Sequence, residues 1–348
     1  MFYIYKTSCI SPQSSYGSPA LSELVASAGN KLMAQEPVYS GIPPGILRRM
    51  GKAVRIGIGA ALPLIADKQE TQGIIIGTAN GGMEDCIKFL NQIIEYDEGK
   101  LTPTNFVQST PNAIAGQLGL MQSNKGYNIT HSNRGLSFEN ALMDVDMLLA
   151  ENKNAKYLVG AVDEISAYNF RIEWLGGWYK SEDSSNLNLF ENESDGSIAG
   201  EGAAMFLAGN EKQGSICRLT DIHFFQTDSA GVVKEALTKF LAKHLPSGKS
   251  PDLFMSGENG DRRMQKYYEA CTGSLAANTP VLSFKQMCGE YPTASSFGAW
   301  AACEILRTQE IPMHMLRTSS STSNTPISSI FIYNTYKGNQ HSFMLLEK

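Results

Sequence analysis

The sequence predicts an α/β fold, because short apolar runs alternate along it with segments of helical periodicity. Residues 72–77 (QGIIIG) and 156–162 (KYLVGAV) are nearly continuous apolar runs, which is typical of strands buried on both faces. Between them, the segment that ends at Ala150 has apolar side chains at positions 138, 141, 142, 145, 148 and 149, the spacing of one helical face. At 348 residues, the chain is long enough for one large domain or two.

The first half of the chain begins with an expected strand and a mostly irregular connection. The elements expected before the run at 156–162 are a strand at 2–9, a loop with some helix at 21–41, a helix at 48–65, the strand at 72–77, a helix at 83–96, a loop and helix at 101–116 and a strand at 127–130. Pro111 suits a first helical position. The strand at 127–130 turns sharply through residues 131–135 into the apolar helix. Residues 163–193 are polar and expected to be irregular.

Strand and helix signals repeat in the second half. The expected strands are 217–225, 253–255, 329–334 and 343–346, and the expected helices are 231–244 and 262–271. The alternation of strand and helix therefore extends over the whole chain.

Composition and charge argue against several classes of function. The chain has a formal net charge of −5 and no basic run, which argues against nucleic-acid binding. No apolar stretch approaches the roughly 18 residues that a membrane span needs. The first ten residues, MFYIYKTSCI, lack the features of a signal peptide, so a cytoplasmic location is expected.

No metal site and no cofactor are predicted. The six cysteines lie at positions 9, 86, 217, 271, 288 and 303, and they form no CxxC pair. No two histidines have the spacing of a metal site either. The cysteines are expected to be small buried hydrophobic residues without disulfides.

Four motifs occur in an order that resembles β-ketoacyl synthases. They are GTANGGME at 77–84, PNAIAG at 111–116, SDGSIAGEGAAMFL at 194–207 and SFKQMCGEYPTASSFGAWAACEILR at 283–307. Several motifs in the right order are more specific than any one alone. The resemblance implies a thiolase-like fold, with two related halves in a five-layered α-β-α-β-α arrangement. These halves would be residues 1–210 and 211–348, within one compact unit.

The positions that carry catalysis in this family hold other residues here. The resemblance implies a cysteine that accepts the acyl group and two histidines that stabilise the developing oxyanion. Ser132 stands in place of the cysteine, Ser256 in place of the first histidine and Glu290 in place of the second, whereas Lys285 keeps the family's lysine. An ionised carboxylate cannot donate a hydrogen bond to an oxyanion and would repel it. The sequence therefore predicts a chain without the Cys-His-His triad.

Two arrangements could restore activity, and each has a structural alternative. His131 could activate Ser132 as an acyl acceptor, but neighbouring strand residues point to opposite faces, which favours Ser132 as a small turn residue. Lys285 and Glu290 could act as an acid–base pair, or they could form a buried ion pair that orders the loop, and the ion pair is favoured. The resemblance implies that Glu201, in the GEG motif, joins the same network as this lysine.

Chain-length factors resemble ketosynthases, lack the nucleophilic cysteine and pair with an active ketosynthase. The favoured interpretation is a catalytically deficient subunit of this kind, which helps to shape the acyl tunnel in type II fatty-acid-like, polyketide or aryl-polyene synthesis. Its expected partners are an active ketosynthase and acyl carrier protein, in a homo- or heterodimer. The resemblance implies that the tunnel and dimer face are lined by Phe106, Gln108, Ser109, Thr110 and Phe138.

Two other functions stay open. The first is a divergent active acyltransferase that uses Ser132 or His131, and the second is a homodimeric module that binds acyl groups or carrier protein. Covalent acylation of the chain would favour the first. A heterodimer with a ketosynthase would favour the chain-length-factor interpretation.

Overall fold

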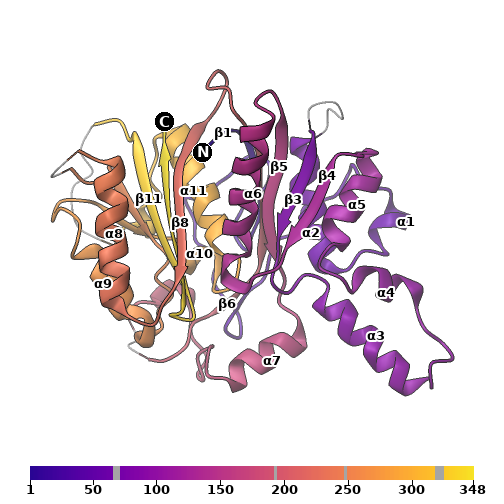
Figure 1. Cartoon of the computed structure of the whole chain (residues 1–348). Coiled ribbons are helices and arrows are strands. Elements are labelled where there is room, and N and C mark those ends of the chain that lie inside the picture. Colours follow the sequence, from indigo (N-terminus) through magenta and orange to yellow (C-terminus); the bar gives the residue numbers. More distant parts are fainter. Residues whose placement is uncertain (66–70, 192–193, 247–248, 318–324) are drawn as a thin grey trace.

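A large mixed sheet organises the chain (Figure 1). The computed structural model describes residues 1–65, 71–191, 194–246, 249–317 and 325–348. Within this part, ten strands join in the order β10-β9-β11-β12-β8-β1-β7-β5-β3-β4. Their bounds are β1 Tyr3–Ile10, β3 Gly73–Gly77, β4 Tyr127–His131, β5 Lys156–Asp163, β7 Gly202–Gly209, β8 Cys217–Gln226, β9 Leu253–Ser256, β10 Val281–Ser283, β11 Ser329–Tyr336 and β12 Gln340–Glu347.

The sheet has two parts that meet at β1 and β8. β1 pairs with β7 along almost its whole length, but it pairs with β8 only at Tyr3–Arg218 and Ile4–Cys217. β3 runs parallel to β4 and β5 in one part, and β9 runs parallel to β10 and β11 in the other. Each part therefore contains the parallel strands that need crossover connections. The division into domains at residue 210 stays a prediction.

Helices cover both faces of the sheet, and their bounds are α1 Pro44–Leu47, α2 Lys52–Ala61, α3 Met83–Glu95, α4 Pro103–Gln108, α5 Ala113–Gln122, α6 Ser137–Glu151, α7 Ala167–Leu175, α8 Ala230–His244, α9 Gln265–Thr272, α10 Lys285–Cys288 and α11 Ser295–Thr308. Ile74 and Ile76 of β3 pack in one core cluster with α2 and α5, whereas Ile75 packs in another with α6. α11 contacts β7, β1 and β11, so it lies between the two parts of the sheet. α8 covers the outer face of the second part, together with α9. The layers are thus α2/α5, sheet, α6/α11, sheet and α8/α9, which is the expected five-layered arrangement.

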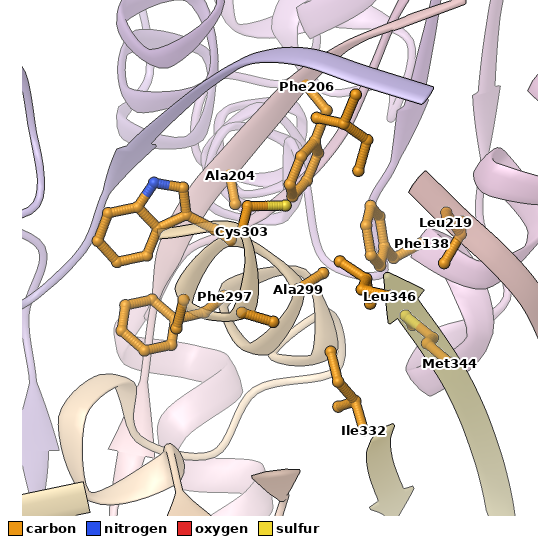
Figure 2. Close-up of a cluster of buried hydrophobic side chains, with 14 of the residues drawn as sticks. Phe138, Ala204, Phe206, Leu219, Phe297, Ala299, Cys303, Ile332, Met344 and Leu346 are labelled. Atoms are coloured by element: carbon orange, nitrogen blue, oxygen red, sulfur yellow. The ribbon is translucent and has the colours of Figure 1, made fainter. Parts of the chain in front are cut away.

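The largest core cluster surrounds α11 (Figure 2). The ring of Phe138 on α6 lies 5.7 Å from that of Phe206 on β7, and both side chains are 1% exposed. Leu219 and Met344 from the second part of the sheet pack in the same cluster. Burial of an apolar side chain of this size contributes about 1.5–3 kcal/mol. The cluster therefore joins the two parts of the sheet around one helix.

Most expected elements are confirmed, and the exceptions have local causes. The helix expected at 48–65 begins at Lys52, because Gly51 before it is extended and a separate short helix starts at Pro44. Residues 21–41 contain no helix but only the short strand β2 (Lys31–Leu32), which pairs with β6 (Ala199–Gly200). The stretch at 163–193 contains α7, which the sequence did not predict, because none of its residues is buried and no apolar face marks it.

No helix in the described part of the chain is both long enough and apolar enough to cross a lipid bilayer.

Candidate functional site

The turn from β4 into α6 places Ser132 at the surface. Ser132 is exposed, and its hydroxyl makes no hydrogen bond to any described residue. The turn is held by Ser137 Oγ, which accepts a hydrogen bond from the Asn133 backbone N–H (2.8 Å). Gly135 follows, and only glycine fits there, because a Cβ would lie 2.2 Å from the Cβ of Tyr336. The described contacts fix the turn without giving Ser132 a base.

His131 points away from this serine. Its Nε2 lies 2.9 Å from Oδ2 of Asp144 on α6, and the Tyr127 hydroxyl donates to the same oxygen at 3.1 Å. A histidine held by a carboxylate on the neighbouring helix is not placed to accept the Ser132 proton, since that step needs direct hydrogen-bond contact.

A buried ion pair occupies the place of the second histidine. Lys285 Nζ lies 2.7 Å from Oε2 of Glu290, and the lysine side chain is fully buried. Gly289, with φ +76°, reverses the chain after α10 and so brings Glu290 back against the lysine. Burial raises the pKa of the Glu290 carboxyl, and the charge of Lys285 opposes that rise. The prediction of a buried ion pair is confirmed.

Asn259, not Ser256, is the residue of the loop after β9 that reaches Glu290. Its Nδ2 donates to Glu290 Oε2 at 2.6 Å. Ser256 is buried at the end of β9, where its Oγ accepts a hydrogen bond from the Glu258 backbone N–H at 3.2 Å. The Asn259 contact was missed from sequence, although an asparagine between Glu258 and Gly260 was an available signal for a polar turn.

Glu290 also lines a small cavity. Its walls come from α7, the segment after α7, the loop after β9 and the β11–β12 turn, among them Asn169, Trp178, Asn259, Tyr336 and Lys337. The cavity volume is about 20 Å³, which is room for about one water molecule. Oε1 of Glu290 has no hydrogen-bond partner among the described residues. Neither Ser132 nor Ser256 lines this cavity, so the three substituted catalytic positions do not face one common space there.

Glu201 lies in a different network from the one expected. It forms an ion pair with Lys52 at the start of α2, and it accepts hydrogen bonds from the backbone N–H groups of Ala34 (2.7 Å) and Ile165 (2.8 Å). The expectation that it joins Lys285 was wrong, because these three partners use both of its oxygens.

The five expected tunnel residues do not share one face. Phe106 is 59% exposed, and Thr110 is also exposed. Gln108 instead accepts from the Gly51 backbone N–H and donates to the Arg49 carbonyl. The Ser109 hydroxyl donates to the Phe106 carbonyl at 2.7 Å. Phe138, the fifth residue, lies in the core next to Phe206 (Figure 2) and does not reach the surface as Phe106 and Thr110 do.

Glu139 is a second buried carboxylate, and it was not predicted from the sequence. It lies on the first turn of α6, fully buried, and accepts a hydrogen bond from the Ser342 hydroxyl of β12 at 2.8 Å. Its other oxygen has no partner within the described chain. Burial raises the pKa of this carboxyl to about 7, against an ordinary value of 4.5. The available signal was a glutamate directly after Phe138 on the apolar helix.

Replacing this glutamate, Glu139→Gln, is expected to remove part of the pH dependence of stability. Between pH 4.5 and about 7 the unfolded carboxyl is ionised while the folded one is still protonated, so rising pH favours the unfolded chain. Above pH 7 the ionised, buried Glu139 carboxylate lowers the free energy of unfolding of the native protein by about 3 kcal/mol. The free energy of unfolding of Glu139→Gln, measured in urea, should therefore rise relative to the native protein between pH 5 and pH 8.

The exposed Glu182 gives the matched control, since Glu182→Gln removes an equal charge at the surface. Its unfolding free energy should stay parallel to that of the native protein across the same pH range. Parallel curves for Glu139→Gln as well would contradict the raised pKa.

Comparisons with known proteins agree with this fold. The family model described as the β-ketoacyl synthase N-terminal domain matches residues 26–171. A search of curated protein sequences finds no match. Solved structures match over nearly the whole chain at low identity, which shows a shared fold.

Three of these structures are complexes from ketosynthase systems. A type II PKS acyl-carrier protein in complex with its ketosynthase (AntDE:AntF, bound to the hexaketide) is 12% identical, with a TM-score of 0.77, and covers 99% of this chain and 98% of that chain. The ishigamide ketosynthase/chain length factor is 16% identical, with a TM-score of 0.73, and covers 99% of both chains. The ketosynthase ApeO with its chain length factor ApeC, from Xenorhabdus doucetiae, is 15% identical, with a TM-score of 0.71, and covers 99% of this chain and 97% of that one.

The sequence resemblance to ketosynthases is thus confirmed by a family model and by structure. Residues 26–171 match the family model of the β-ketoacyl synthase N-terminal domain, and the whole chain has a thiolase-like fold similar to that of the solved ketosynthase and chain length factor structures.

Proposed function

We propose that this chain is a non-catalytic subunit that pairs with an active ketosynthase, in the manner of a chain length factor. The observation that carries the proposal is the Lys285–Glu290 ion pair, which stands where the resemblance implies a histidine that donates a hydrogen bond. A carboxylate that accepts from Lys285 and Asn259 has no proton to give to an oxyanion. The cavity beside it has no room for an acyl chain in this conformation. Condensation therefore falls to the partner.

The similar structures support the choice of partners. Two of them are described as a ketosynthase with a chain length factor, and a third as a ketosynthase with an acyl-carrier protein. By analogy of fold, we assign this chain an active ketosynthase as its partner and acyl carrier protein as the substrate carrier. The product class would be a type II fatty-acid-like, polyketide or aryl-polyene chain.

A surface at the open edge of the sheet fits a partner subunit. β4 is the last strand of the described sheet, so its outer edge presents unpaired backbone N–H and C=O groups. Three apolar side chains on β4 and α6 are exposed beside it, namely Tyr127 (40%), Met143 (39%) and Met147 (62%), and Leu120 on α5 is 78% exposed. We call these four residues and the edge of β4 the β4 face. Exposed apolar groups beside an open strand edge are typical of an interaction surface.

Phe106, Gln108, Ser109 and Thr110 belong to the proposed contact with the partner's acyl chain. The Phe106 ring packs on Phe89 at 5.3 Å, which orients it while most of its surface stays exposed. The Ser109 hydroxyl donates to the Phe106 carbonyl, and the Gln108 side chain bonds to the backbone of Gly51 and Arg49. Phe106 and Thr110 are therefore the side chains that could change product length by their size.

Co-expression tests the proposal. The tagged chain, produced together with an active ketosynthase from the same source, should purify as a one-to-one heterodimer in native mass spectrometry. The pair should extend an acyl primer with malonyl-carrier protein, and the isolated chain should not. The isolated chain should also gain no acyl mass during incubation with acyl-carrier protein, and Ser132→Ala should leave the activity of the pair unchanged. Acylation of Ser132, or extension by the isolated chain, would instead identify the chain as a catalyst.

A further inference from the structure

A lysine in the β11–β12 turn lines the same cavity as Glu290. Lys337 Nζ lies 2.5 Å from Oε2 of Glu173 on α7 and 4.7 Å from the ring centre of Trp178. Both members of the ion pair and the ring line the cavity. The side chains of Lys337 and Glu173 are 24% and 19% exposed, so their interaction is less screened than that of a fully exposed pair.

A second cation contacts the same indole ring. The guanidinium carbon of Arg263 lies 4.6 Å from the ring centre of Trp178. Arg263 is fixed in turn by Asp261 (Nη2 to Oδ2, 2.6 Å) and by the Gly177 carbonyl (2.7 Å). Each cation–π contact contributes modestly, and more when it is shielded from water. Together they tie α7, the loop after β9 and the β11–β12 turn to one ring at the cavity.

The backbone of this turn does not explain the lysine. Lys337 and Gly338 have φ +54° and +64°, and the Asn339 N–H donates to the Tyr336 carbonyl at 3.2 Å. Turns with two consecutive positive φ values favour Asn, Asp or Gly at the first position. A lysine is less favourable for the backbone at this position. Its presence therefore indicates that the contacts of its side chain matter.

We infer that Lys337 is a latch that, paired with Glu173 and seated on Trp178, keeps the Glu290 cavity closed to anything larger than water. Only the functional consequence of the latch rests on the proposed function. With the latch closed, a growing acyl chain finds no binding site in this subunit and stays bound to the partner.

Cysteine labelling of the isolated chain tests the latch. Met264 lines the cavity and is 6% exposed, so Met264→Cys provides a thiol at the protected site. Cys86→Ser removes the one native cysteine that is not buried. Iodoacetamide labelling at the new thiol, followed by peptide mass spectrometry, then reports access to the cavity. Lys337→Gln and Glu173→Gln, which break the pair from two different elements, should each raise the labelling rate about tenfold.

Lys337→Arg is the matched control, because it keeps the charge and the ring contact, and it should label as slowly as the parent. Equal rates, within about twofold, in the parent and both glutamine variants would overturn the latch, as would a parent thiol that reacts as fast as it does in urea. Circular dichroism of each variant guards against loss of fold. The labelling experiment contains no ketosynthase, so a negative result in it does not contradict the proposed pairing with a ketosynthase. Failure of the co-expression experiment, in turn, does not contradict the latch.

Discussion

Replacing Lys285 with methionine is expected to lower the free energy of unfolding by about 3–5 kcal/mol, because the Glu290 carboxylate is then left buried without its counter-ion. Glu290 is 8% exposed, and one of its oxygens already has no partner among the described residues. Asn259 would be the one remaining side chain that the structure shows donating to it. Equilibrium unfolding in urea at pH 7, followed by circular dichroism, measures the change.

The double variant Lys285→Met/Glu290→Gln separates the charge from the packing. Glutamine still accepts the hydrogen bond from Asn259 but carries no charge, so the double variant should regain most of the lost stability. Lys239→Met is the surface control, because the side chains of its pair with Glu235 are 75% and 66% exposed, and exposed pairs of this kind contribute little to stability. A Lys285→Met variant that loses no more stability than this control would show that the buried pair does not hold the loop.

The strands were predictable because their sequence pattern and their burial agree. Ile74, Ile75 and Ile76 form a continuous apolar run, since α2 and α5 cover one face of β3 and α6 covers the other. α7 was not predictable in this way. Ile172 and Leu175 on it are 63% and 66% exposed, so no buried face within the described chain imposes a period on its sequence.

Within the site, the Lys285–Glu290 pair was predicted, but the other side chain that reaches Glu290 was not. Lys285 and Glu290 were considered as a pair because of their places in one motif, and the reversal at Gly289 brings them together. Asn259 was missed because Ser256, the last residue of β9, was matched to the family's histidine, whereas the side chain that reaches Glu290 comes three residues later, in the loop. The closed cavity depends on Lys337, which meets Glu173 and Trp178 only through the tertiary fold. Contacts of this kind have no local sequence signal.

Replacing Met147 with aspartate is expected to weaken binding to the ketosynthase partner about 100-fold, because it puts a charge into an apolar contact. Met147 is 62% exposed on α6 and belongs to the β4 face. Because Met147 is largely exposed, as Tyr127 and Met143 of the same face also are, its side chain does not fill the core of this chain. The dissociation constant of the purified pair, measured by surface plasmon resonance, gives the effect, and thermal unfolding of the isolated chain should be nearly unchanged.

Met313→Asp is the matched control, because Met313 is 78% exposed but lies far from the β4 face. Leu316, three residues after it, forms a β-bridge with Leu282 on β10, and β10 is at the opposite edge of the sheet from β4. If both variants weaken binding equally, the effect comes from the added charge and not from the β4 face. If neither does, the partner binds elsewhere. If Met147→Asp alone weakens binding, the interface lies beside β4. Ser132 follows directly after this strand. The residue that replaces the catalytic cysteine would then lie next to the partner ketosynthase, which we propose keeps its cysteine.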